Sequence, residues 1–402
     1  MPDYPNPYDF VPLTNQQPPR RAWCAATDGM DRSLPERYSG RLLCLLHPET
    51  PLFVHGIEQQ KEVQRRFFRQ GNEVCIPATT LKGALRSLYE IVSDSCMSSI
   101  ADKYQAPRSH IRTYPGMSQQ EYDQLHPIYE ADKITPNGYL PCLQLSQACP
   151  ACLLFGMIER VQDGTPLAGR LLFSDAKAVT PRAQWIKIPA AGGGPHPWHS
   201  TFYLDSAGKL LGRKLYYHHR DYQETIALYG DGGHGGLIQL EGQQGDFRFT
   251  IDFHNLTEDE LGSLVYTLAL EPDLRHHLGY GKPYGLGSAQ IRVEEVQLWE
   301  RPGGPVGQRF LTFAAQPIRP SDIQQWVQRR VAKTRQQWEA RFDDETNYIR
   351  TVGQFKRILH WPGEELYKYP SFEWFRRTAG SGTITLAEYQ RGVREPNRGN
   401  RP

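Results

Sequence analysis

The amino-acid sequence predicts an α+β protein: a ferredoxin-like, RRM-type domain with long insertions, followed by a mainly helical C-terminal extension. Candidate strands and amphipathic helices follow one another in the order strand, helix, strand, strand, helix, strand, which is the order of that fold. Hydrophobic residues make up 39% of the 402 residues, which is enough for a core. The 36 glycines and 31 prolines predict many turns and long loops.

The first half of the predicted domain is a strand followed by a helix. The strand covers 40–46 (GRLLCLL) and ends at the turn-forming segment HPETP. The polar stretch 57–70 is expected to be a loop or a short exposed helix. The helix after it has one apolar face, formed by Leu81, Leu85, Leu88, Tyr89 and Val92.

The second half contains two further strands, a helix and a last strand. The strands cover 169–174 (GRLLFS) and 246–253 (DFRFTIDF), and the second alternates apolar and polar residues. The helix covers 257–270, with Thr257 as N-cap and Glu260 as its capping-box partner. A glycine-rich segment, LGYGKPYGLGS, then leads directly into the strand AQIRVEEVQLW.

Regions outside this pattern divide the chain into three parts. Residues 1–38 are rich in proline, asparagine and glutamine, and predict an extended N-terminal arm. The ferredoxin-like domain then covers 39–300, with insertions at about 97–160 and 178–240. From 301 to 402 we expect a basic, mainly helical extension with a flexible end.

Net charge and cysteine usage limit the classes of function. The formal charge is +2, which alone predicts no polyanionic partner, although 321–402 carries +5 and 1–320 carries −3. The sequence has no run of 18 apolar residues and no secretory signal pattern, so we expect no membrane partner. Seven cysteines, an odd number, predict a reducing compartment and therefore the cytoplasm.

The cysteines around CPAC suggest a metal site. Cys149 and Cys152 form a CxxC knuckle, and Cys142 lies seven residues before it. Two thiolates of a knuckle with two further ligands are a common tetrahedral zinc arrangement, which here would be structural. Three buried or free thiols remain the alternative. The candidates for the fourth ligand are, in order of preference, His126, His110 and Cys96.

Basic residues beside glycine occur in two segments and suggest contacts with phosphate. Lys82, Gly83 and Arg86 lie near the start of the first helix, where backbone N–H groups and a cation can hold a phosphate. An ordinary solvated basic face is the simpler interpretation of these residues alone. The segment 279–287 (GYGKPYGLG) fits neither a P-loop nor a dinucleotide fingerprint, and by composition is a turn.

Four segments, taken in order, resemble a known family. They are IPATTLKGALRSLYE (76–90), CPACLLFG (149–156), GRLLFSDA (169–176) and HHLGYGKPYGLGSAQI (276–291). They resemble the RAMP superfamily of CRISPR-associated proteins, in particular the backbone subunits of type III RNA-targeting effector complexes. The similarity covers about 40–298. The arm NPYDFVPL (6–13) and the element GRKLYYHH (212–219) resemble those of a sub-group of these proteins.

The resemblance implies an RNA-binding subunit of an antiviral ribonucleoprotein. Its partners would be guide RNA, target RNA and the other RAMP-type and large subunits, and 178–240 would form a thumb-like insertion at the duplex. Related proteins often carry a zinc knuckle before the LFG element, which favours zinc here. The residues that the resemblance implies for RNA binding are Lys82, Gly83, Arg86, Gly281, Lys282, Gly285, Arg213 and Lys214.

The resemblance also bears on catalysis. Backbone subunits that cut target RNA use an aspartate and a divalent metal such as magnesium in the loop after the first strand. The corresponding segment, 53–74, contains no aspartate. We therefore expect a binding subunit without catalytic residues. The alternatives are a metal-dependent endoribonuclease using Glu58, or a guide-processing endoribonuclease using His55 as general base.

Overall fold

The computed structural model describes twelve segments of the chain, and every structural statement below concerns them. They are residues 4–14, 16–29, 36–56, 63–100, 134–136, 138–159, 164–190, 201–230, 236–299, 315–342, 345–370 and 385–389. In these segments no helix is both long enough and apolar enough to cross a membrane.

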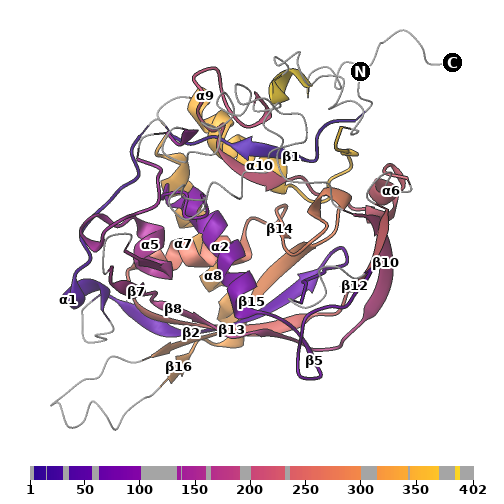
Figure 1. Cartoon of the computed structure of the whole chain (residues 1–402). Coiled ribbons are helices and arrows are strands. Elements are labelled where there is room, and N and C mark those ends of the chain that lie inside the picture. Colours follow the sequence, from indigo (N-terminus) through magenta and orange to yellow (C-terminus); the bar gives the residue numbers. More distant parts are fainter. Residues whose placement is uncertain are drawn as a thin grey trace.

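A four-stranded antiparallel sheet forms the centre of the fold (Figure 1). Its strands lie in the order β15 (Ser288–Trp299), β2 (Tyr38–Pro48), β13 (Phe247–Leu256) and β8 (Leu171–Phe173). Of these four strands, the first along the chain, β2, therefore lies between the third, β13, and the fourth, β15. This is the arrangement of a ferredoxin-like domain, as the sequence predicted.

Short strands extend this sheet at both edges. They are β14 (His276–His277) and β16 (Ala315–Pro317) beside β15, and β9 (Ala176–Ala178), β5 (Glu73–Ile76) and β4 (Arg69–Gln70) beyond β13. Together the described strands make a nine-stranded sheet. Part of the polar stretch 57–70 thus belongs to strands, because β4 pairs with β5 and β3 (Gln64–Arg65) pairs with a strand of another sheet.

Three helices cover one face of the central sheet (Figure 1). They are α2 (Ala78–Val92), α7 (Glu258–Ala269) and α8 (Pro320–Glu339). The apolar stripe of α2 that the sequence predicted is buried, and α7 begins with the expected capping box between Thr257 and Glu260. The inward side of β13, including Phe249 and Phe253, packs beneath them in one hydrophobic cluster.

The remaining described strands form three smaller sheets. They are β1 (Tyr8–Val11) with β11 (Arg213–Tyr216), β10 (Ala183–Pro189) with β12 (Leu237–Gln243) and β3, and β6 (Gly156–Ile158) with β7 (Pro166–Ala168). The first of these joins the N-terminal arm to the 178–240 insertion by antiparallel pairing. The remaining helices are α1 (Ala25–Asp28), α5 (Pro150–Phe155), α6 (Tyr222–Ala227), α9 (Glu345–Tyr348) and α10 (Gln354–Leu359).

The described part of the C-terminal region is helical and packs on the domain. In α8, Ile323 and Trp338 are buried, and Trp338 contacts Tyr266 of α7 with ring centroids 6.1 Å apart. Phe355 of α10 also contacts Trp338, with ring centroids 5.1 Å apart. The extension therefore shares a core with the helical layer of the domain.

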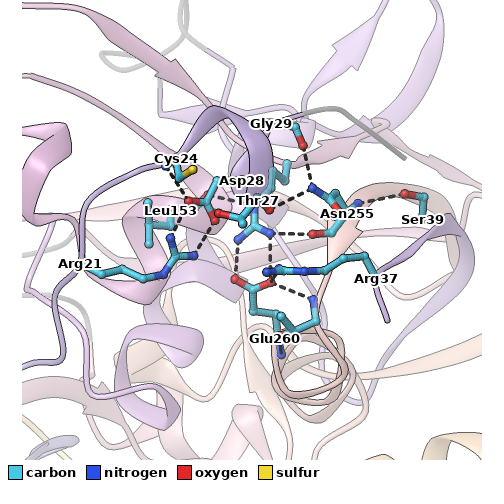
Figure 2. Close-up of polar contacts among 12 residues, drawn as sticks. Arg21, Cys24, Thr27, Asp28, Gly29, Arg37, Ser39, Leu153, Asn255 and Glu260 are labelled. Atoms are coloured by element: carbon cyan, nitrogen blue, oxygen red, sulfur yellow. Dashed lines mark hydrogen bonds and ion pairs between the residues drawn. The ribbon is translucent and has the colours of Figure 1, made fainter. Parts of the chain in front are cut away.

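A network of charges fastens the arm to the start of α7 (Figure 2). The buried Arg170 donates to both carboxylate oxygens of Glu260, at 2.9 and 2.5 Å, and Arg37 lies 3.6 Å from the same carboxylate. Arg21 forms a second bidentate pair with Asp28, at 2.5 Å for both contacts. Because Glu260 also accepts the backbone N–H of Thr257, these contacts fix the first turn of α7.

Candidate metal centre and nucleic-acid interface

Four buried cysteines come together beside α2 and α5. Their sulfur atoms all lie within 4.8 Å of one another, and the set consists of Cys96, Cys142, Cys149 and Cys152. Cys149 immediately precedes α5 and Cys152 lies in its first turn, so a single helix start presents both thiols of the CxxC knuckle. Cys96 follows the end of α2, which brings the fourth thiol from a different part of the chain.

The sulfur positions fit a tetrahedral ion. Four thiolates about 2.3 Å from one zinc ion would lie about 3.8 Å from one another. Here the sulfur of Cys96 lies 3.7 Å from that of Cys152 and 3.6 Å from that of Cys149. The cluster can therefore hold a metal ion.

The fourth member of the cluster is Cys96, the third choice for a fourth ligand made on the sequence. Cys96 occupies the position for which His126 was preferred, and it completes the set without a histidine. His126 and His110 lie outside the described residues. Sequence spacing could not decide among these candidates, because the partner of a knuckle is chosen by tertiary structure. The sequence did offer one signal for Cys96, because it is a cysteine like the other three residues of the cluster.

Arg86 faces this centre. Its guanidinium donates to Sγ of Cys152 at 3.3 Å, to the carbonyl of Gly156 at 2.9 Å and to the carboxylate of Glu90 at 3.0 Å. Because all three partners belong to the protein, the side chain of Arg86 is held inside it. The structure thus separates Arg86 from Lys82, with which the sequence grouped it as a phosphate ligand.

Lys82 and Gly83 are at the surface of the same helix. Gly83 is exposed, and a Cβ atom built on it would meet nothing within 4 Å. Partial burial, and then the charge of Arg86, lower the pKa of Lys82. The described residues offer this ammonium no ion pair within 4.0 Å.

The glycine-rich loop holds a second lysine close to the 178–240 insertion. Gly281 and Gly285 have φ of 84° and 76°, a left-handed conformation that favours glycine, on either side of the short turn Lys282–Tyr284. Burial, and then the charge of Lys214, lower the pKa of Lys282. Lys214 belongs to β11, and its Nζ lies 3.7 Å from the centre of the Tyr8 ring. The fold thus brings two predicted lysines together from distant segments.

Arg213, the residue before Lys214, points the other way. It is buried, with 7% of its surface exposed, and its guanidinium donates to the carbonyl of Ser95. Its charge lies over the ring of Tyr139, 5.4 Å from the centroid. In this arrangement Arg213 is not accessible to RNA, although the sequence grouped it with Lys214. Alternation along a strand separates the two residues, because adjacent side chains point to opposite faces.

The tandem histidines are part of the core. His218 stacks on His277 with ring centroids 4.5 Å apart, and both His218 and His276 are buried. Burial lowers the pKa of His276 to about 4 and that of His277 to about 3, so these rings are neutral near pH 7. These histidines therefore pack within the protein.

The described residues give little support to the two catalytic alternatives, Glu58 and His55. Glu58 lies outside them. His55 is half-buried, its ring packs edge-on against Phe53, and its Nε2 atom is buried without a hydrogen-bond partner. A general base needs an accessible nitrogen and is usually oriented by a third group. No carboxylate in the described part of the chain orients His55 by a hydrogen bond.

The outer face of the central sheet carries paired charges. Arg41 donates to Asp252 at 2.5 and 2.8 Å, and Arg248 to Glu294 at 3.1 Å. Since these arginines already have carboxylate partners, this face offers less free positive charge than the Lys214 and Lys282 region. The geometry therefore favours the glycine-rich loop as the candidate nucleic-acid interface.

A ferredoxin-like domain with a cysteine cluster in its first insertion defines the class of protein. Residues 46–290 match the RAMP superfamily, which is more than half of the chain. The protein therefore belongs to the RAMP superfamily of CRISPR-associated proteins. This membership supports a place as a subunit of a CRISPR effector complex.

Other comparisons add little to this assignment. No curated protein matches the chain. The crystal structure of Thermofilum pendens Csc2 aligns with 78% of this chain and 81% of its own, at 14% sequence identity and a TM-score of 0.31. At that score the similarity supports no further argument.

Proposed function

We propose that the protein is an RNA-binding backbone subunit of a type III CRISPR effector complex in antiviral defence. It holds guide RNA and the guide–target RNA duplex, works in the cytoplasm with other RAMP-type and large subunits, and has no cleavage activity of its own. The 178–240 insertion acts as the thumb at the duplex. Sequence specificity comes from base pairing with the guide, while this chain contacts the backbone.

The observation that carries this proposal is the pairing of Lys214 with Lys282. Burial first, and then the charge of Lys214, lowers the pKa of Lys282, and no carboxylate in the described residues forms an ion pair with either lysine. Two cations within reach of each other's charge favour a nearby anion, and a phosphate of an RNA backbone would supply it. The ring of Tyr216 on the same strand lies 5.0 Å from the Lys214 ammonium.

The remaining RNA contacts belong to the same proposal. Lys82 and Gly83 offer a second phosphate position at the exposed surface of α2, and Gly281 and Gly285 shape the loop that carries Lys282. Arg86 and Arg213 are not carried into this set, because both side chains are occupied inside the protein. The proposed interface therefore consists of lysines on α2, the glycine-rich loop and β11.

We further propose that the cysteine cluster binds a structural zinc ion. The ligands would be Cys96, Cys142, Cys149 and Cys152, and four thiolates leave no open coordination position. A closed site of this kind stabilises the fold and does no chemistry. Its expected effect is to tie the first insertion to the end of α2.

The proposal is tested by co-expressing the protein with the CRISPR proteins encoded beside it in the genome. The RNA that co-purifies is then sequenced. We expect RNA of uniform length that carries a constant repeat-derived tag. Heterogeneous cellular RNA, or none, would contradict it. Cleavage assays of complexes with Glu58→Ala and His55→Ala test the enzyme alternatives. Loss of one specific cut in either variant would make the protein an endoribonuclease.

A matched pair of variants tests the interface itself. Lys214→Gln with Lys282→Gln should weaken RNA binding equally across sequences and reduce the salt slope of log K by about 1 to 2. The control is Lys177→Gln with Lys333→Gln, which removes the same charge from exposed positions on β9 and α8, outside the 178–240 insertion. Equal effects in the two double variants would show that only net charge matters and would remove the assignment.

A further inference from the structure

Arg213 is a buried cation that forms no direct ion pair with an acid. Its Nε–H group is buried and finds no acceptor among the described residues, and no carboxylate there lies within 4.0 Å of the guanidinium. The nearest acids, Glu90 and then Asp94, favour its charge through space without an ion pair. Glu90 accepts from Arg86 and from Ser98, and Asp94 accepts from Tyr139 at 2.6 Å. A charge buried in this way is costly unless something nearby compensates it.

The cysteine centre lies beside this cation. Arg213 donates to the carbonyl of Ser95, the residue directly before the ligand Cys96. Ser95 also accepts the backbone N–H of Ala151, inside the CPAC knuckle, at 3.1 Å. Arg213 thus contacts the segment that links two ligands of the centre.

Charge balance indicates what compensates Arg213. A divalent ion with four thiolates carries a net charge of about −2. Arg86 reaches the centre from the other side, at Sγ of Cys152, but shares its charge with Glu90. A second cation would therefore stabilise the anionic centre further, and Arg213 is a buried cation that forms no direct ion pair with an acid in the described residues. Each would lower the electrostatic cost of burying the other.

We propose that Arg213 is a positioning residue of the metal centre and that metal occupancy holds β11 in place. The inference rests on the proposed zinc site. β11 pairs with β1 of the N-terminal arm, from Arg213 opposite Val11 to Tyr216 opposite Tyr8. The next residue, Lys214, belongs to the proposed RNA interface. Metal binding is thereby linked to the strand that presents an RNA-binding lysine.

The first test measures how firmly the full-length protein retains zinc. Arg213→Met removes the charge at similar volume, Arg213→Lys keeps it, and Arg248→Met is the control on the outer sheet face. In a chelator competition, Arg213→Met should release zinc about 10-fold more readily than wild type, with Arg213→Lys in between and the control unchanged. Equal retention in Arg213→Met and the control would overturn the proposal.

The second test needs no variant and no RNA. Hydrogen exchange of the wild-type protein is measured with zinc bound and after removal by a chelator. Faster exchange in β1 and β11, with β2 and β13 unchanged, is the expected result. Unchanged exchange in β11, or a protein that binds no zinc, would overturn the link. RNA binding by the lysine variants is measured separately, so its failure is distinguishable from failure of this inference.

Discussion

The central sheet and the cysteine cluster are built on different principles. On β13, Phe247, Phe249 and Phe253 are each at most 1% exposed and pack under the helical layer, so the sheet is held by apolar burial. The four cysteines belong to the same hydrophobic cluster, but their surroundings add sulfur contacts, arginine side chains and backbone hydrogen bonds. Burial of apolar area stabilises a fold directly, whereas buried polar groups do so only when all of them are satisfied. We therefore expect the sheet to hold without a metal, and the proposed metal centre to depend on one.

Loss of a ligand should give the largest difference between the two regions. Cys149→Ser removes one of four thiols and should abolish stoichiometric zinc and lower the free energy of unfolding by ~3 kcal/mol or more, a fraction of a structural zinc's binding energy. Cys44→Ala, in the buried strand β2, should keep the zinc. Metal analysis and denaturant unfolding check both. Zinc retained by Cys149→Ser would break the comparison.

The ion pairs offer a second contrast, between a buried and an exposed arginine. Arg170→Met leaves Glu260, whose side chain is only 16% exposed, with its weaker contacts alone, and should cost about 3 kcal/mol. Arg41→Met breaks a pair whose arginine side chain is 47% exposed, and should cost less than about 1 kcal/mol. Urea unfolding of both variants measures the difference. Equal losses would mean that burial does not govern these pairs.

Acid should destabilise the protein through two histidines at the edge of the sheet, His276 and His277. The pKa of His276 in the folded protein is about 4 and that of His277 about 3, below the ordinary value of 6.5. The unfolded chain therefore binds more protons as the pH falls, and stability present above pH 6.5 is lost toward pH 4. Each histidine should cost about 2 kcal/mol between pH 6.5 and 5.

Unfolding free energies measured across this pH range test the histidines. His277→Gln should reduce the slope, because it removes one of the depressed groups while keeping an amide that can bond the carbonyl of Leu286. His360→Gln, at an exposed ring, is the control and should leave the slope nearly unchanged. An identical slope in His277→Gln and wild type would count against the buried, neutral ring.

The smallest expected effect is that of a helix cap. Thr257→Ala removes the hydroxyl that accepts the N–H of Glu260 and should cost about 1 kcal/mol. Ser321→Ala, near the start of α8, is the control because its hydroxyl bonds only the neighbouring Asp322. Thermal unfolding of the two variants measures how much stability the cap contributes in addition to apolar burial.

The sheet could be predicted from sequence because its signals are local. Alternation over 246–253 and the apolar stripe of the first helix each encode one face of one element, and both regions formed as expected. The capping box at Thr257 and Glu260 is likewise contained in four consecutive residues. Pairing of these elements in ferredoxin-like order then follows from burying their apolar faces together.

The candidate sites were only partly predictable because they depend on distant segments. Sequence identified the knuckle, but Cys96 is 53 residues from Cys149 and its role is set by how α2 ends. Arg86 and Arg213 have the residue type of RNA ligands, yet both point inward once the insertions dock. The approach of Lys214 to Lys282 also arises only in the folded chain.

The contacts of the N-terminal arm have a consequence for synthesis on the ribosome. Tyr389 donates to the carbonyl of Tyr4, 385 residues away in sequence, and Lys368 donates to that of Pro5. β1 cannot pair until β11 has been made, and its surroundings are complete only when residue 389 has left the ribosome. The first strand to emerge is thus among the last to settle, so nascent chains must keep Tyr8 and Phe10 from premature association.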